Sequence, residues 1–122
     1  MRIVKTETHD LKARVLEYAA RVVRLSCALP PSSEAQMIKN QLFRSGTSVG
    51  AHVAEANRGK SRADFVSKLE GALQELEETK YWMELLIVLK LVEVSRLDAL
   101  MQETDEITAI LVAMVSRSRK NQ

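Results

Sequence analysis

Apolar residues recur every three or four positions in four segments of this 122-residue chain, and short breaks separate the segments. Side chains at that spacing lie on one side of a helix, so each segment predicts an amphipathic helix with one face in a core. The composition agrees, because Ala, Leu, Glu, Lys and Arg are common and aromatic residues make up only 4% of the chain. We therefore expect an all-α fold.

The first expected helix spans about residues 8–29 and ends before Pro30-Pro31, because proline lacks the backbone N–H that a continuing helix needs. Its core face carries six apolar residues: Leu11, Val15, Tyr18, Val22, Leu25 and Leu29. A second apolar strip follows the far side of the same helix: Leu16, Ala20, Val23 and Cys27.

The second expected helix begins with a cap from Ser32 or Ser33 and ends near Asn57. Gly46 and Gly50 lie inside it, four residues apart, a spacing that permits a neighbouring helix to approach closely. Its core side carries Ile38, Leu42, Val49, Val53 and Ala56.

Ser61 with Asp64, and Ser95 with Asp98, resemble capping boxes that open a third and a fourth helix. The core stripe of the third helix is Phe65, Leu69, Ala72, Leu73, Leu76, Met83, Leu86 and Ile87. That of the fourth is Leu97, Leu100, Met101, Thr104, Ile107, Leu111, Met114 and Val115. Because the connections are short, we expect an antiparallel up-down-up-down four-helix bundle, with residues 1–122 forming one domain.

A polar stripe lies directly beside the apolar face of the second helix and consists of Gln41, Arg44, Ser48, His52 and Glu55. A neighbouring helix would half-bury these side chains, so each needs a hydrogen-bonding partner. The Arg44 guanidinium favours a carboxylate, and the candidates are Glu55, Glu75, Glu77 and Glu78. Such a pair could fix the helix register or bind a ligand, and the residues alone leave both functions open.

Charge is distributed unevenly along the chain. Residues 1–69 hold twelve Lys or Arg against six Asp or Glu, a net +6, whereas residues 70–122 hold six against ten, a net −4. The two halves could attract each other within a bundle or between subunits, and the basic half could also bind anions.

Five basic residues are the candidates for binding nucleic acid: Arg58, Lys60, Arg62, Arg21 and Arg24. The first three lie in a loop beside the start of the third helix, where backbone N–H groups favour phosphate. No aromatic residues interleave with these cations, so the pattern does not indicate base stacking. Solvated loop charges are the alternative interpretation.

Trp82, Leu85 and Leu89 lie opposite the core stripe of the third helix. Aromatic anchors are enriched at interfaces, so these three residues predict a self-association surface.

Enzyme chemistry is not indicated. Gly59-Lys60-Ser61 resembles the end of a phosphate-binding P-loop, but position 54 is Ala and a helix replaces the preceding strand. His52 and Glu55 share one helix side without the second Glu-x-x-His pattern of a di-iron bundle, and Cys27 is expected among apolar positions as an inert thiol. We expect no catalytic residues, metal site or cofactor.

The sequence favours the cytoplasm. The N-terminal residues lack a secretory signal, and a single cysteine suits a reducing compartment. The longest nearly apolar run, Met83–Val94, is interrupted by Glu84, Lys90 and Glu93, so no membrane span is expected.

The order of these signals resembles a bacterial family of four-helix-bundle proteins associated with intervening sequences of 23S ribosomal RNA genes, sometimes labelled ribosomal-like. The resemblance covers nearly the whole chain and lies in the Pro stop, Gln41-Leu42-Phe43-Arg44-Ser45, Ser48-Val49-Gly50-Ala51, Ala54-Glu55, Ser61, Phe65, Leu69, Ala72 and Leu76-Glu77. Where the family usually shows Asn-Ile-Ala-Glu-Gly, this chain has His52-Val53-Ala54-Glu55-Ala56.

The resemblance implies a homopentameric ring and kinship with accessory proteins of diversity-generating retroelements, which assist a reverse transcriptase and bind nucleic acid through basic surfaces. We therefore expect a non-enzymatic, oligomeric binding protein that engages RNA or DNA phosphates. The alternative is a homo-oligomeric scaffold that binds another protein and has no nucleic-acid role.

Overall fold

The computed structural model describes residues 5–120, with side chains from Asp10 onward. The ends of the expected 1–122 domain, residues 1–4 and 121–122, lie outside the described residues. Residues 5–120 form four α-helices: α1 Lys5–Cys27, α2 Ser33–Asn57, α3 Arg62–Val88 and α4 Val94–Lys120. The expected all-α fold is confirmed.

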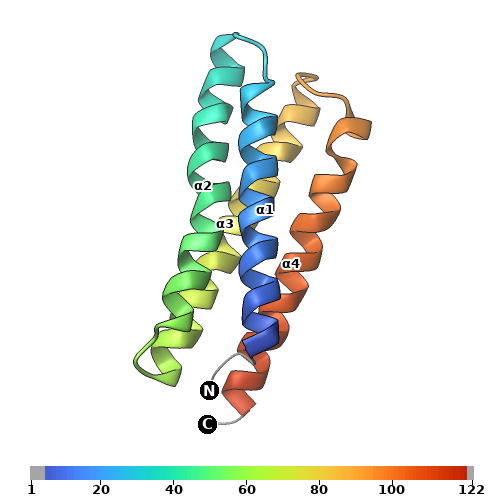
Figure 1. Ribbon diagram of the computed structural model, residues 1–122. Coiled ribbons are helices and arrows are strands. Elements are labelled where there is room, and N and C mark those ends of the chain that lie inside the picture. The colour runs from blue at the N-terminus through green and yellow to red at the C-terminus, as the bar shows by residue number, and fades with distance from the viewer. Residues whose placement is uncertain (1–4, 121–122) are drawn as a thin grey trace.

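The helices form an antiparallel bundle (Figure 1). The start of α1, the α2–α3 loop and the end of α4 lie at one end of the bundle, and the other two loops lie at the opposite end. Contact is most extensive between α2 and α3, and α1 touches α4 only sparingly. Within the described residues the backbones of α1 and α3 do not lie side by side, so these two helices are diagonal in the bundle.

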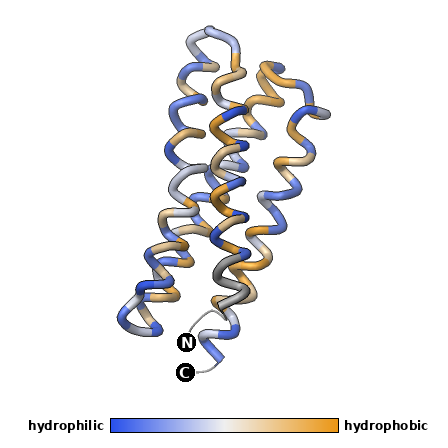
Figure 2. The backbone as a smooth tube through the Cα atoms, viewed as in Figure 1, coloured by the Kyte–Doolittle hydropathy of each residue, from blue (hydrophilic) through white to orange (hydrophobic). Residues whose placement is uncertain are grey.

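Hydrophobic residues recur along every helix (Figure 2) and meet in one core. The expected core faces are confirmed, with Leu25, Leu73, Ile87 and Met101 partly rather than fully buried. Among the largest fully buried side chains are Tyr18, Ile38, Leu42, Leu69, Leu76, Met83, Leu86, Ile107 and Leu111. Leu16, on the far side of α1, is 69% exposed.

Two of the three expected caps are present. The Ser32 and Ser61 hydroxyls accept hydrogen bonds from backbone N–H groups three residues on, at 3.3 and 3.0 Å. The cap expected at Ser95 is wrong, because α4 begins at Val94 and Ser95 already lies in its first turn. The carbonyl of Glu93 accepts from the N–H of Arg96 at 3.0 Å, so the helical turn starts earlier than the serine pattern indicated.

Candidate functional site

The expected polar stripe of α2 faces α3. We call this contact the α2–α3 seam; it comprises Gln41, Arg44, Ser48, His52 and Glu55 of α2 with Lys68, Gly71, Glu75 and Glu78 of α3. Gln41, Ser48 and His52 are half-buried, whereas Arg44 and Glu55 are exposed. Glu55 pairs with Lys68 at 3.3 Å.

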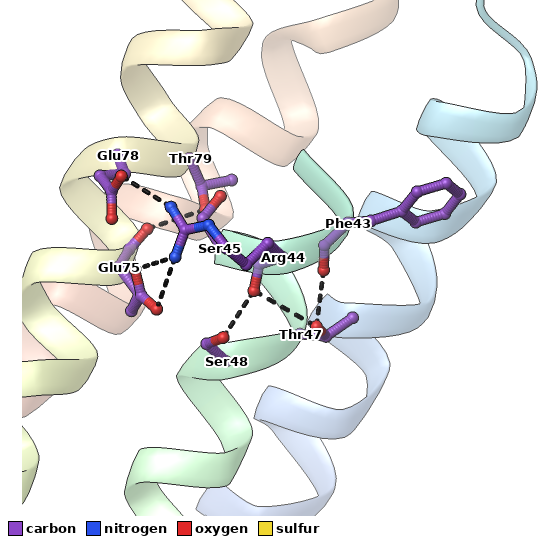
Figure 3. A network of polar contacts seen from close by, with 8 residues as sticks. All are labelled: Phe43, Arg44, Ser45, Thr47, Ser48, Glu75, Glu78 and Thr79. Carbon is purple, nitrogen blue, oxygen red and sulfur yellow. Dashed lines mark hydrogen bonds and ion pairs between the residues drawn. The ribbon is translucent and has the colours of Figure 1, made fainter. Parts of the chain in front are cut away.

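Arg44 is the centre of the seam (Figure 3). Its Nη1 donates to both carboxylate oxygens of Glu75 at 3.3 Å, and its Nη2 donates to Oε1 of Glu78 at 2.8 Å. Half of the Arg44 side chain is exposed, but only 12% of the Glu75 side chain is. The predicted pairing of Arg44 with a carboxylate is confirmed, and Glu75 and Glu78 are the partners among the four candidates.

The two glutamates hold protons differently. Burial disfavours the Glu75 carboxylate, but a hydrogen bond from Glu78 and the positive charge of Arg44 outweigh burial and lower its pKa. The pKa of Glu78 is raised, first by its hydrogen bond to Glu75 and then by burial.

His52 lies against α3 at Gly71. A Cβ atom at Gly71 would come within 2.8 Å of the His52 imidazole, so glycine makes room for the ring. The Nδ1 atom of His52 is buried and has no hydrogen-bond partner among the described residues. His52 therefore fills the seam as a packed ring.

Each helix also contributes one hydroxyl to a buried layer that the sequence did not predict: Tyr18, Ser45, Thr79 and Thr104. Thr104 donates to the carbonyl of Leu100 at 2.8 Å, so the Tyr18 hydroxyl donates to Thr104 across 2.7 Å. Burial raises the pKa of Tyr18 to about 12, and hydrogen bonds with Thr104 and Thr79 only partly oppose this rise. The Tyr18–Thr104 bond joins α1 to α4, and the Ser45–Thr79 bond joins α2 to α3. Each bond therefore fixes the register of one helix against its neighbour.

Sequence reasoning missed further cations that lie at the same end of the bundle as the basic loop. The last turn of α4 ends at the same end of the bundle as the α2–α3 loop (Figure 1). We call this surface the basic end; it comprises Arg58, Lys60, Arg62, Arg117, Arg119 and Lys120. The expected antiparallel topology could have predicted these cations, because it places the start of α3 and the end of α4 at the same end of the bundle.

Arg21 and Arg24 lie elsewhere. They belong to the last two turns of α1, at the opposite end from its start, which lies beside the basic end. At about 1.5 Å of rise per residue, Arg21 is roughly 24 Å along α1 from Lys5. Arg24 forms an exposed ion pair with Glu17 at 3.3 Å. The predicted five-residue basic set is thus divided into two separate surfaces.

The predicted interface residues are less exposed than their pattern indicated. Trp82 and Leu85 are partly buried and pack against the core of their own bundle, whereas Leu89 is 43% exposed. Trp82 is therefore not a fully exposed anchor. Other exposed apolar residues in this part of the chain are Tyr81, Val88 and Val94.

Three further expectations concern chemistry and membranes. Cys27 is exposed at the end of α1, so the prediction that apolar neighbours enclose it is wrong; the helix ends there and leaves its side uncovered. Among the side chains from Asp10 to Lys120, His, Cys, Asp and Glu do not gather in threes as a metal site requires. None of the described helices is long and apolar enough to cross a membrane.

A model of the 23S rRNA-intervening sequence protein family matches residues 7–113. The chain belongs to this family. A solved structure from Bacteroides thetaiotaomicron, a protein of unknown function from the S23 ribosomal protein family, is 36% identical, with a TM-score of 0.83. The match covers 89% of this chain and 97% of that one. A comparison with curated proteins finds no match.

Membership of the 23S rRNA-intervening sequence family confirms the resemblance expected from the sequence. The solved S23 relative confirms the bundle, since a TM-score of 0.83 over most of both chains means that the helices share one arrangement.

Proposed function

We propose that this chain is a non-enzymatic, oligomeric protein of the cytoplasm that binds RNA or DNA phosphates through its basic end. The observation that carries the proposal is the convergence of cations from the α2–α3 loop and the last turn of α4 on one end of the bundle. Phosphate contacts supply most of the sequence-independent affinity for nucleic acid.

Two cations of the basic end, Arg58 and Lys60, differ from those along the bundle, whereas Arg119 pairs with Glu70 of α3 at 2.5 Å. Arg14 and Arg44 are held by carboxylates of a neighbouring helix, which neutralise them. Arg58 and Lys60 are exposed and form no ion pair with any residue that the structure describes. Their charges therefore remain available to phosphate oxygens.

Oligomerisation would strengthen such contacts. The far side of α1 exposes Leu16, and the diagonally placed α3 exposes Val88 and Leu89. Exposed apolar residues on two diagonal helices suit head-to-tail association, which closes into a ring when the rotation permits. A ring, which the resemblance to the family implies to be a homopentamer, would multiply weak phosphate contacts.

Filter binding of RNA and DNA across a salt series tests the nucleic-acid function. Phosphate contact predicts affinity that falls steeply with salt and is similar for unrelated sequences. Light scattering at micromolar concentration tests the assembly, with Leu89→Glu expected to lower the mass. A parent protein that fails to bind at low salt would contradict the function, and a monomer mass would contradict the assembly.

A homo-oligomeric scaffold for another protein is the second candidate function. The exposed apolar residues of α1 and α3 favour it, because a surface that self-association leaves uncovered can bind a partner. This scaffold would show oligomers in light scattering without any salt-dependent RNA binding.

A further inference from the structure

A hollow of about 470 Å³ lies on α3, away from the basic end. Its lining comes from two successive turns of the helix: Gln74, Glu77, Glu78, Tyr81 and Trp82. The volume falls in the range of about 300–1,000 Å³ that is usual for small-molecule sites and exceeds what one ion needs.

The walls of the hollow combine aromatic rings with carboxylates. The rings of Tyr81 and Trp82 meet edge to face, with centroids 5.0 Å apart and planes at 78°. Tyr81 is 57% exposed, so it presents an aromatic surface to solvent instead of to the core. Aromatic faces carry negative electrostatic potential and attract cations, most often arginine.

Negative charge is in excess here. Glu77 is exposed and forms no ion pair with any residue that the structure describes. Glu78 shares Arg44 with Glu75, so one guanidinium serves two carboxylates. An additional cation in the hollow would be attracted by Glu77 and by the incompletely compensated pair.

We propose that this hollow binds an arginine side chain of a basic polypeptide. A guanidinium is planar, stacks on an aromatic ring and offers paired N–H donors to a carboxylate, so Tyr81 and Glu77 match its two properties. A lysine ammonium satisfies only the charge. A metal ion would need several converging ligands, which the residues from Asp10 to Lys120 do not assemble.

The single tryptophan of the chain provides the readout. Acetylated and amidated tetra-arginine is titrated into the full-length protein while Trp82 emission is recorded, with tetra-lysine and tetra-glutamate in parallel. The expected result is a saturable change with tetra-arginine, weaker binding of tetra-lysine and none of tetra-glutamate. Tyr81→Ala and Glu77→Gln should each weaken tetra-arginine binding by about two- to five-fold.

Glu84→Gln is the matched control, because Glu84 is an exposed glutamate of α3 outside the hollow. It should leave the affinity unchanged within about two-fold. Equal losses for Glu77→Gln and Glu84→Gln would mean general charge attraction and would overturn the proposal. The proposal would also be overturned if tetra-arginine gave no saturable signal at any protein concentration. The hollow would then be assigned to another occupant, such as a second copy of the chain.

Discussion

A Cβ atom placed on Gly46 would lie 2.5 Å from Cγ1 of Val22, whereas one placed on Gly50 would lie 3.6 Å from Cγ2 of Val15. The first distance is a clash with a fully buried side chain, and the second is ordinary contact. Helices α1 and α2 therefore depend on glycine at position 46 but not at position 50. Of the two glycines spaced four residues apart, only Gly46 is needed for the close packing of α1 against α2.

This difference predicts opposite effects of two alanine substitutions. Gly46→Ala should lower the free energy of unfolding by about 1–3 kcal/mol, because overpacking outweighs the gain in helix propensity. Gly50→Ala should raise it by up to about 1 kcal/mol, since only the propensity gain remains. Urea unfolding of both variants measures this, and equal effects would show that the close approach at Val22 is relieved elsewhere.

Arg44→Ala should lower the free energy of unfolding by about 1–2 kcal/mol. It leaves the largely buried carboxylate of Glu75 without its cation, but half of Arg44 is exposed, which keeps the cost below the ~3–5 kcal/mol of a fully buried pair. Adding Glu75→Gln should recover part of the loss, because the uncompensated charge is removed. A change below about 0.5 kcal/mol would mean that the pair is only a surface contact.

Stability should also fall in acid through Glu103. Arg14 donates from Nε and Nη2 to the two carboxylate oxygens of Glu103 at 2.8 and 2.7 Å. These hydrogen bonds lower the pKa of Glu103 below its ordinary 4.5, against burial. The unfolded chain then binds the proton more readily, so the stabilisation is present above pH 4.5 and is lost as pH falls through the lower folded pKa.

Arg14→Met is the variant that isolates this effect. It should flatten the decrease in unfolding free energy between about pH 5 and pH 3, since Glu103 then loses the partner that lowers its pKa. The pKa of Glu75 is also lowered and that of Glu78 is raised, and both residues are unchanged in the Arg14→Met variant. Urea melts across this range would contradict the account if parent and variant fell in parallel.

Tyr18→Phe tests the buried hydroxyl layer. It removes the donor to Thr104, whose own hydroxyl keeps its bond to the carbonyl of Leu100, so the cost should be about 1 kcal/mol. In a Thr104→Val background the same change should cost less, because the partner is already gone. Identical costs in both backgrounds would show that the two hydroxyls act independently.

The sequence predicted features that short stretches of chain determine. Pro30-Pro31, the Ser61 cap and the apolar spacing act within a few residues, so the helices and their core faces were correct. Which glutamate Arg44 meets depends on the register of α2 against α3, which no local pattern contains. Tyr18 and Thr104 were likewise assigned to the core without their mutual bond.

The features of the site that depend on tertiary structure could be predicted only in part. The loop cations were recognised, but the presence of Arg119 at the same end of the bundle required the lengths of two helices to match. Trp82 was expected to be free for an interface, since a helical wheel cannot show how far a large ring reaches toward a neighbouring helix.

The basic end is tested most directly by RNA binding of two matched triple variants over a salt series. One carries Arg58→Gln, Lys60→Gln and Arg62→Gln; the other carries Arg24→Gln, Lys90→Gln and Arg96→Gln at the opposite end, with the same loss of charge. Thermal melts confirm that both are folded. The account predicts weaker binding and a shallower salt dependence for the first variant only. Equal losses in both variants, or no loss in the first, would contradict it.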